Sequence, residues 1–497
     1  MRKLHPDLFK YQVAGVEWLD KVGSGLLADE VGLGKSAQAA CALTTPAIVV
    51  CPAPLRVNWV RELKRWRPEL TVAMISGRSA PLAAALTADV VVVNYEVLES
   101  YVNALAARPV ATLVVDEAHY AKSLVVRNKR DKVTKTWKRT YSGSSRAKAI
   151  AKLAEVSERR ILLTGTPAPN RPIELFPLLH LVDPKTWRST ATFGGKYCAG
   201  HLKTVARGKK VWDFSGSSNV EELHAKINGT VMLRRLQQDV LSDLPAKSRR
   251  TLLVSLSEAA EREYAAAESD FLAWVMASGG PEAVEKSAKG EVLAKMTALR
   301  HVAALGKVEY ALNWITQHQE GTKRPLIVMG HHRDVMESIY ESLVTAGLRV
   351  GRISGGQSAE DKQRDIDAFQ AGALDVICCS IMAAGVGITL TAASESLFVE
   401  RAWRPSDLVQ AEGRNYRIGQ TRPVTVTYLD AAGTIDEDLA KLLQEKVKTI
   451  AGVVDGLDLS TAQAEESVFG SMLESRRPGD RTLLRTKQLP LPVQSGW

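Results

Sequence analysis

Residues 112–119, TLVVDEAH, decide the fold of this chain, because an unbroken apolar run leads directly into acidic residues. Runs that are dense in Val, Ile and Leu, without alternating polar residues, are typical of strands buried on both faces of a parallel sheet. In open sheets of this kind, ligands bind beyond the carboxyl ends of the strands, which is where the polar residues lie here. The further runs are AIVVCP (47–52), DVVVVNY (89–95), RILLTGTP (160–167), PLIVMGH (325–331), DVICCS (375–380), SLFVERAW (396–403) and VTVTYLD (424–430).

Helical stretches separate these runs, for example residues 53–67 and 360–371. Alternation of strand and helix predicts βαβ units and an α/β fold. The runs form two series, which predict two lobes that each contain a parallel sheet. Between the series, the Ala- and Glu-rich segment SEAAEREYAAAESDFLAWVMA (257–277) predicts a helical protrusion. The expected parts are a first lobe at 1–250 with a basic insertion at 122–148, the protrusion at 251–300, a second lobe at 301–450, and a polar and basic tail at 451–497.

Composition limits the class of protein. The chain has 497 residues, of which 45% are hydrophobic and 24% are charged, and this is ordinary for a globular protein of about three domain-sized units. Its net charge of +10 fits a polyanionic partner. None of the five cysteines forms a Cys-x-x-Cys pair, so we expect neither a zinc site nor a disulfide framework. No apolar run reaches the length of a membrane span, and we expect a cytoplasmic protein of a bacterium or virus-infected cell, or a nuclear protein if the source is eukaryotic.

The glycine-rich segment ADEVGLGKS (28–36) predicts a phosphate-binding loop. Backbone N–H groups of such a loop close around phosphates at the N-terminus of the following helix, and Gly32 and Gly34 permit that geometry. Lys35 would reach the β- and γ-phosphates, and the Ser36 hydroxyl would bind Mg²⁺. Taken alone, the segment also fits a glycine-rich turn before a helix.

The acidic pair in VVDEAHY (114–120) favours a phosphate-binding loop over a simple glycine-rich turn. Asp116 at the end of a strand beside a phosphate loop would hold Mg²⁺, and Glu117 would orient and deprotonate the attacking water. The alternative is a pair of surface acids in the first turn of a helix, where Asp and Glu are favoured. That alternative explains neither the apolar strand nor the upstream glycine-rich loop, so the two motifs together predict an enzyme that hydrolyses a nucleoside triphosphate.

The motif set resembles superfamily 2 helicases, and more narrowly the Swi/Snf-type ATPases. In that family the first motif has Asp where the simple phosphate-loop pattern has Gly, so Asp29 is expected and joins the nucleotide-binding residues. The resemblance runs from residue 8 to residue 430 and rests on Gln12, GLGKS (32–36), DEAH (116–119), LLTGTP (162–167), GVGITLT (385–391) and QAEGRNYRIGQ (410–420). It is strongest to the annealing-helicase (HepA-related protein) subfamily, through TPAPNRPIEL (166–175), WDFSGSSN (212–219) and VMLRRLQQDVLSDLPAK (231–247).

The resemblance implies two RecA-like lobes that use ATP and Mg²⁺. Arg414 and Arg417 would approach the γ-phosphate from the second lobe, so that hydrolysis depends on lobe closure. Thr164, Thr166 and Gln410 would couple nucleotide state to that closure.

Other motif positions have roles by the same resemblance. Gln12 would bind the adenine edge, Gly387 would lie at the nucleotide, and Thr389 would touch the DNA backbone. Where the family usually has Asp, Ala and His, this chain has Gly413, Asn415 and Tyr416, and these departures put the coupling to DNA in doubt.

The insertion at 122–148 contains ten Lys or Arg residues and one Asp. Such a segment can neutralise DNA phosphates without reading sequence, although a solvated loop is the alternative. Asn58 and Trp59 fit a family motif near the DNA backbone. The basic residues expected to contact DNA are Arg127, Lys129, Arg130, Lys132, Lys135, Lys138 and Arg139.

We therefore expect an ATP-dependent translocase on double-stranded or forked DNA, which remodels or anneals forks and bubbles or displaces bound proteins. We also expect a monomer that is targeted by partner proteins, without zinc or a membrane. Three alternatives stay open: a strand-separating helicase on RNA or DNA, an ATP-dependent switch, and the motor subunit of a larger complex.

Overall fold

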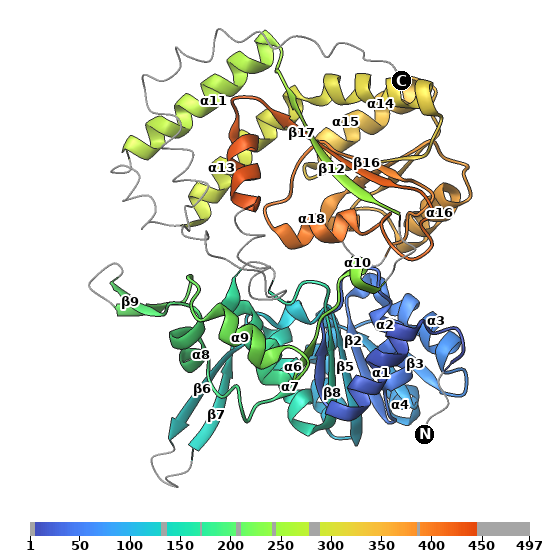
Figure 1. The fold of residues 1–497 in the computed structure, drawn as a ribbon, viewed down its shortest axis with the longest axis vertical. Coiled ribbons are helices and arrows are strands. Elements are labelled where there is room, and N and C mark those ends of the chain that lie inside the picture. Colours follow the sequence, from blue (N-terminus) through green and yellow to red (C-terminus); the bar gives the residue numbers. More distant parts are fainter. Residues whose placement is uncertain are drawn as a thin grey trace.

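The computed structural model describes residues 5–130, 137–168, 171–204, 210–240, 245–277, 289–384 and 388–444. They form two lobes (Figure 1), each built on a parallel sheet with helices packed against it. The predicted α/β class with two parallel sheets is confirmed.

The first lobe contains a seven-stranded sheet in the order β11-β1-β8-β5-β2-β4-β3. Its strands are β1 (Gly25–Leu27), β2 (Ala47–Cys51), β3 (Val72–Ile75), β4 (Val90–Asn94), β5 (Val110–Asp116), β8 (Ser157–Leu163) and β11 (Met232–Leu233). Its helices are α1 (Lys10–Val22), α2 (Lys35–Ala42), α3 (Arg56–Trp66), α4 (Ala83–Thr87), α5 (Tyr95–Ala106), α6 (Ser145–Val156), α7 (Phe176–Val182), α8 (Thr190–Tyr197) and α9 (Val220–Ile227).

Strand β4 shows why this sheet is buried on both faces. Val91 and Val93 belong to one hydrophobic cluster, whereas Val90 and Val92 belong to the cluster on the opposite face. Successive strand residues point to opposite faces, so an unbroken apolar run can bury both sides only between two layers of helices.

The second lobe contains a six-stranded sheet in the order β12-β17-β16-β13-β15-β14. Its strands are β12 (Lys247–Val254), β13 (Leu326–Gly330), β14 (Val350–Ile353), β15 (Val376–Ser380), β16 (Glu395–Phe398) and β17 (Val424–Ala431). Its helices are α11 (Glu258–Ala277), α13 (Lys289–Gly306), α14 (Val308–Thr322), α15 (Arg333–Thr345), α16 (Ala359–Gln370), α17 (Ile381–Ala384) and α18 (Pro405–Glu412), and α10 (Gln237–Val240) lies before β12.

The helical region after residue 250 packs on the second lobe. Tyr264 and Phe271 of α11, with Met296 and Leu299 of α13, belong to the same hydrophobic cluster as the second sheet, and Figure 1 shows both helices beside that lobe. Because β12 pairs with β17, the chain enters the second sheet at Lys247, slightly before the expected boundary at 250. The assignment of a function to each expected part of the chain stays a prediction. The expected tail at 451–497 lies outside the described residues.

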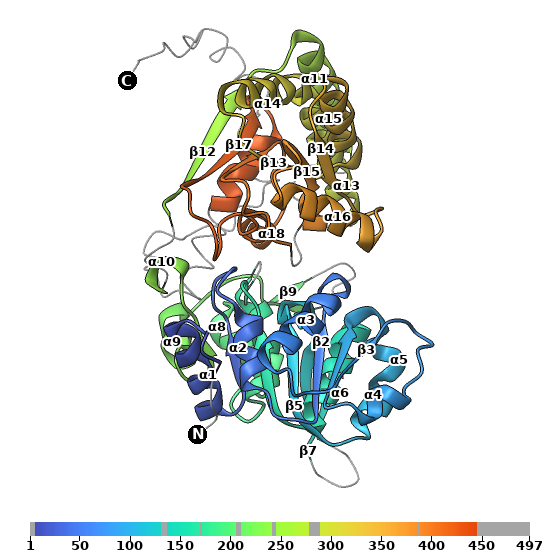
Figure 2. The same cartoon turned by 90° about the vertical axis from the view of Figure 1, so that its right-hand side faces the viewer.

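Two antiparallel ribbons project from the first lobe. The first, β6 (Val125–Arg130) with β7 (Trp137–Ser142), forms much of the basic insertion. Figures 1 and 2 show it at the end of the lobe that is remote from the second lobe. The second ribbon consists of β9 (His201–Thr204) and β10 (Lys210–Asp213).

Two further observations concern the described residues as a whole. Every helix among them is too short or too polar to cross a lipid bilayer. All five cysteines are buried free thiols.

A buried ion pair stabilises the second lobe. The Lys307 ammonium is 1% exposed and donates to the Asp436 carboxylate at 2.6 Å and to the Leu429 carbonyl at 2.9 Å. Asp436→Ala would leave that ammonium buried without its counter-charge, so we expect a loss of about 3–5 kcal/mol in the free energy of unfolding. Urea denaturation followed by circular dichroism measures this. As the control, Glu258→Ala breaks an exposed pair with Arg262 and should cost no more than about 1 kcal/mol; equal losses in the two variants would contradict the prediction.

Candidate active site

The phosphate-type loop predicted from the sequence connects β1 to α2. Gly32 and Gly34 have φ angles of 91° and 68°, which L side chains rarely adopt. A Cβ atom on Gly34 would also lie 2.3 Å from Nε2 of Gln12. The Lys35 ammonium turns into the loop and donates to the carbonyls of Asp29 (2.7 Å) and Glu30 (3.0 Å). Burial lowers the pKa of Lys35, and the nearby Glu117 carboxylate opposes that shift.

Asp29 does not face a ligand space. It is fully buried, and its carboxylate accepts from Nη2 (2.5 Å) and Nε (2.9 Å) of Arg235 and from Nε2 of Gln38 (3.1 Å). Protein donors occupy its oxygens, so the residue anchors the loop, and its expected contact with nucleotide stays a prediction. A simple phosphate loop has glycine at position 29, whereas this chain has an aspartate there that pairs with Arg235.

Gln12 and Tyr11 support the same loop from α1. Nε2 of Gln12 donates to the Leu33 carbonyl at 3.3 Å, and its Oε1 accepts from the backbone N–H of Phe9 at 3.0 Å. The Tyr11 hydroxyl donates to the same carbonyl at 3.1 Å. Both polar ends of Gln12 therefore have protein partners, and its contact with adenine stays a prediction.

The acidic pair lies where β5 ends, beside the loop. Oδ2 of Asp116 accepts from the Trp59 indole N–H at 2.8 Å, and Oδ1 accepts from the backbone N–H of Glu117 at 2.9 Å. The Tyr95 hydroxyl donates to the Asp116 carbonyl at 2.5 Å. Glu117 has a φ of 50°, so the chain turns sharply there.

The two carboxyl groups differ in pKa. Burial, and next the neighbouring Glu117, raise the pKa of Asp116 to about 7. Burial also acts to raise the pKa of Glu117, but His119 at 3.2 Å and the cations of Lys35 and Arg414 together hold it below its usual range. The site therefore favours a charged Glu117, which can accept a proton, beside an Asp116 that gains from an added cation.

The motif after β8 contacts the acidic motif. The Thr164 hydroxyl lies 3.2 Å from Nδ1 of His119 and accepts from the backbone N–H of Thr166 at 3.1 Å. Thr164 is fully buried and Thr166 is half-buried. The segment after β8 is thus in direct contact with the acidic motif, and the coupling roles of Thr164 and Thr166 stay predictions.

The second lobe contributes two arginines that follow α18. Arg414 and Arg417 both donate to the Ile388 carbonyl, at 3.4 and 3.1 Å. Burial and the Arg417 cation lower the pKa of Arg414 to about 10, and Glu117 of the first lobe opposes this shift. A Cβ atom on Gly32 would lie 2.9 Å from Cβ of Arg417. The two arginines therefore lie next to the first lobe's loop and acidic pair.

Two comparisons with protein families can now be set beside this geometry. The model of the SNF2-related domain matches residues 11–307, which is more than half of the chain, and that of the helicase conserved C-terminal domain matches residues 306–419.

The chain belongs to the SNF2-related family.

Two relatives align with almost the whole chain. A SWI/SNF-related matrix-associated actin-dependent regulator of chromatin subfamily A-like protein 1 from Xenopus tropicalis is 32% identical over 97% of this chain and 48% of its own length. The DNA annealing helicase and endonuclease ZRANB3 from Mus musculus is 30% identical over 96% of this chain and 44% of its own length. The chain thus spans about half the length of these relatives.

Among solved structures, the Sulfolobus solfataricus SWI2/SNF2 ATPase core in complex with dsDNA is 24% identical, with a TM-score of 0.40 over 91% of this chain and 94% of that chain. This similarity is too low to carry functional information.

The departures from the usual SNF2-related pattern lie at the contact between lobes. A Cβ atom on Gly413 would lie 2.8 Å from Cγ1 of Val31, so only glycine lets the two lobes approach this closely here. The Tyr416 carbonyl accepts from Nε2 of Gln237 at 3.1 Å, and the same amide donates to the Val31 carbonyl at 2.6 Å. The Asn415 side chain is buried within the second lobe. Gly413 thus leaves room for the first lobe's loop, whereas the contact at position 416 is made by the backbone and does not depend on the tyrosine side chain.

Sequence reasoning missed Arg235 and Gln237. Both lie in VMLRRLQQDVLSDLPAK (231–247), which was noted only as a subfamily resemblance. The signal was present, because charged and amide side chains directly follow the last strand of the first sheet. Their partners, however, lie far away in the sequence. Arg235 binds Asp29 and Gln237 binds Val31, and each pair is 206 residues apart.

The residues that were expected to contact DNA differ in their exposure to solvent. Trp59 is 1% exposed, and its indole N–H donates to Asp116, so it supports the acidic motif, and its expected contact with DNA stays a prediction. Asn58, one residue earlier on α3, is exposed. Thr389 is half-buried, and Gln410 is buried in α18. Gly387 lies outside the described residues.

The basic ribbon is not part of the site between the lobes. Arg127 and Lys138 are exposed on it, and Nη2 of Arg139 donates to the Pro184 carbonyl at 3.4 Å. Lys129 and Arg130 belong to the paired part of β6, whereas Lys132 and Lys135 lie outside the described residues. A DNA contact by this ribbon stays a prediction.

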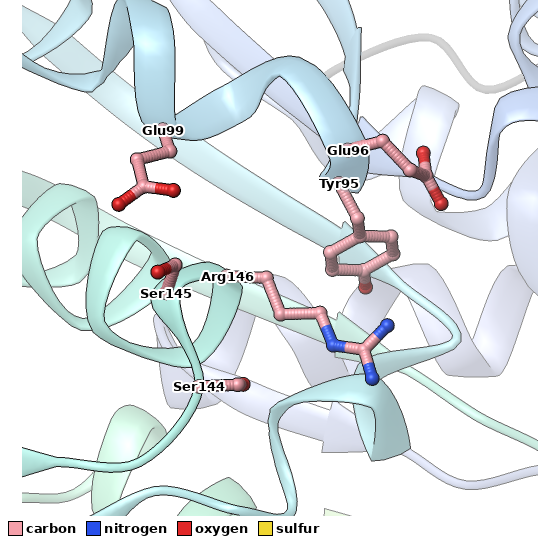
Figure 3. A pocket seen from close by; sticks show the side chains of 6 residues that line it. All are labelled: Tyr95, Glu96, Glu99, Ser144, Ser145 and Arg146. Atoms are coloured by element: carbon pink, nitrogen blue, oxygen red, sulfur yellow. The ribbon is translucent and has the colours of Figure 1, made fainter.

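A small hollow lies behind the acidic motif (Figure 3). It is about 260 Å³ in volume. Tyr95, which binds the Asp116 carbonyl, stacks on Tyr120 at a ring distance of 5.1 Å, and the Arg146 guanidinium lies 5.1 Å from the Tyr120 ring. This stack fills the back of the acidic motif and holds it in place. The residues that line the hollow are Tyr95, Glu96, Glu99, Ser144, Ser145 and Arg146.

The Asp29–Arg235 pair yields a stability prediction. Arg235→Met would leave the buried Asp29 carboxylate without its cation, so we expect a loss of about 3–5 kcal/mol in the free energy of unfolding. Asp29→Asn together with Arg235→Met removes both charges and should cost less than the sum of the single changes. A double-mutant cycle by urea denaturation measures the coupling; strictly additive losses would show that the pair does not hold the loop.

Proposed function

We propose that this chain is an ATP-dependent motor on double-stranded DNA, which remodels or anneals forks and bubbles or displaces bound proteins. The observation that carries the proposal is the position of Arg414 and Arg417 of the second lobe against Gly32 and Glu117 of the first. An arginine that reaches the phosphates only across a lobe interface ties hydrolysis to a change in that interface. Such a linkage is what a motor requires.

The nucleotide of this proposal is ATP. Its phosphates would lie in the loop of Gly32 and Gly34, where backbone N–H groups and the start of α2 favour anions. The buried Lys35 ammonium would then exchange the loop carbonyls for phosphate oxygens. Glu117 would accept the proton of the water that attacks the γ-phosphorus, because its surroundings favour the charged carboxylate. Arg414 and Arg417 would stabilise the charge that develops on the transferred group.

The residues also fit Mg²⁺. Ser36, the second residue of α2, and Asp116 at the end of β5 would hold the ion. Burial and, next, the neighbouring Glu117 carboxylate raise the pKa of Asp116, and a divalent cation at this position would oppose both effects. Held by these two residues, Mg²⁺ would supply positive charge that offsets the negative charge of the phosphates. Trp59 keeps one carboxylate oxygen of Asp116 oriented.

The choice of duplex DNA as track rests on the net charge of +10 and on the family. The fork and annealing activity is proposed from the name of the relative described as a DNA annealing helicase. We further propose a monomer that acts in the cytoplasm, or in the nucleus of a eukaryote, with partner proteins to supply targeting.

Steady-state ATP hydrolysis tests the proposal, with no nucleic acid, single-stranded DNA, duplex, forked DNA and RNA at one salt concentration. We expect stimulation by duplex and forked DNA. Glu117→Gln and Arg417→Ala should each lower the DNA-stimulated kcat by about 10³-fold, because both groups act in the transition state. Arg364→Ala, which changes an exposed arginine on α16, is the control.

Other results would favour other functions. Stimulation only by RNA or single strands would indicate a strand-separating helicase. Absence of stimulation by every nucleic acid would indicate a switch or a motor subunit that needs its complex.

Trp59 provides a separate test of the metal site. Trp59→Phe keeps most of the buried volume but removes the N–H that orients Asp116, and loss of such an outer partner weakens metal binding by about tenfold or more. We therefore expect the half-saturating Mg²⁺ concentration for binding of a fluorescent ATP analogue to rise by about tenfold. The control is Trp187→Phe, since that buried indole N–H has no hydrogen-bond partner among the described residues. An unchanged Mg²⁺ dependence in Trp59→Phe would remove Trp59 from the site.

A further inference from the structure

The β9–β10 hairpin stands apart from the core of the first lobe. All of its strand residues are exposed, except the half-buried Asp213. An isolated two-stranded hairpin is marginally stable in water. Apolar side chains exposed on such an element gain nothing from folding, so they indicate a surface that is used in binding.

The base of the hairpin is nevertheless anchored. Phe214, directly after β10, packs against the hydrophobic cluster of the first lobe. Cβ atoms on Gly194 and Gly200 would lie 2.4 and 2.8 Å from its ring, so both glycines leave room for it. Oδ1 of Asp213 accepts from the backbone N–H of Ser215 at 2.9 Å. The hairpin is therefore held at its base while its strands extend into solvent.

This anchor positions Trp212. Its ring stacks on Phe214 with centroids 5.7 Å apart and planes 12° from parallel. Trp212 is nevertheless 55% exposed, and Leu202, directly opposite on β9, is 53% exposed. A large ring supported by a core-anchored ring, and beside an exposed leucine, is a preformed stacking surface that costs little side-chain entropy to use.

A positive charge lies beside Trp212, which favours a negatively charged partner. Lys210 is exposed and lies two residues before Trp212 on β10, so both side chains point to the same face of the hairpin. Lys203, which pairs with Val211, is exposed on the opposite face. Aromatic rings among cations are typical of surfaces that stack bases and neutralise phosphates. Paired bases are already stacked within a duplex, so Trp212 suits unpaired bases.

The position of the hairpin fits this partner. Figure 1 shows β9 on the side of the first lobe that faces the second lobe, and Figure 2 shows the same from the perpendicular direction. The basic β6–β7 ribbon lies at the opposite end of the lobe. A strand that enters between the lobes would therefore meet the β9–β10 hairpin and not the basic ribbon.

We propose that the β9–β10 hairpin binds unpaired bases of DNA, with Trp212 as the stacking surface and Lys210, on the same face, as a phosphate contact. The proposal rests on the proposed function in taking DNA as the polymer. It assigns the preference for forks and bubbles to a site within the motor itself.

Fluorescence anisotropy with the full chain tests the proposal at one salt concentration. The probes are a fluorescein-labelled fork with two oligo(dT) arms and a fully paired duplex of the same length. We expect Trp212→Ala to lower the ratio of fork affinity to duplex affinity by about tenfold, which is within the range for loss of base stacking on an aromatic ring. Trp212→Phe keeps a ring and should lose less. The control is Tyr310→Ala, because Tyr310 is an aromatic residue of the second lobe that is 41% exposed.

Each outcome decides the proposal. A fork-to-duplex ratio in Trp212→Ala that stays within about twofold of wild type overturns it, and would assign the hairpin to a protein partner. Equal weakening on fork and duplex also overturns it, because the ring would then not distinguish unpaired bases. ATP hydrolysis by the wild-type chain is measured with the same two DNAs. Absence of stimulation there would contradict the motor, whereas the affinity ratio would still report on the hairpin.

Discussion

One buried ion pair, between Asp29 and Arg235, anchors the glycine-rich loop of this protein. Asp29 is fully buried, and a carboxylate in that position is stable only with a cation and further donors around it, which Arg235 and Gln38 provide. The pair joins the segment after β1 to the segment after β11, so it closes the first lobe around the loop. The glycines of the loop can then hold their left-handed backbone conformations, because both ends of the loop are fixed.

The second constraint is the close approach of the two lobes. Val31 occupies the space that a side chain at position 413 would need, Arg417 lies against Gly32, and the Gln237 amide joins the two lobes through Val31 and Tyr416. These contacts bring groups of both lobes to one place, which agrees with the proposal that an arginine of the second lobe completes the site.

Helix α3 has one face in the site and the other exposed to solvent. Trp59 lies inside and orients Asp116, and its neighbour Asn58 is exposed. Burial lowers the pKa of Arg417, and the charge of Glu62 opposes that shift. A single helix thus influences both the carboxylates and the arginines of the site. The same lobe carries the β9–β10 hairpin, whose exposed ring is supported by the core through Phe214. The proposed base contact thus lies on a hairpin anchored to the core, whereas turns after β5 and α18 carry Glu117 and the two arginines.

The sequence by itself determined the α/β class, the two series of strands, the family and the identity of the motifs around Lys35, Asp116 and Arg414. These features are local: apolar density over five or six residues predicts a strand buried on both faces, and a short motif is read without knowing its neighbours. Only the tertiary structure decided that Asp29 anchors the loop, that Trp59 faces inward, and that Gly413 makes room for Val31. Each of these contacts joins segments far apart in the chain, 206 residues for Asp29 and Arg235. No local pattern encodes such a partner, because burial and pairing arise only when the sheet brings distant segments together.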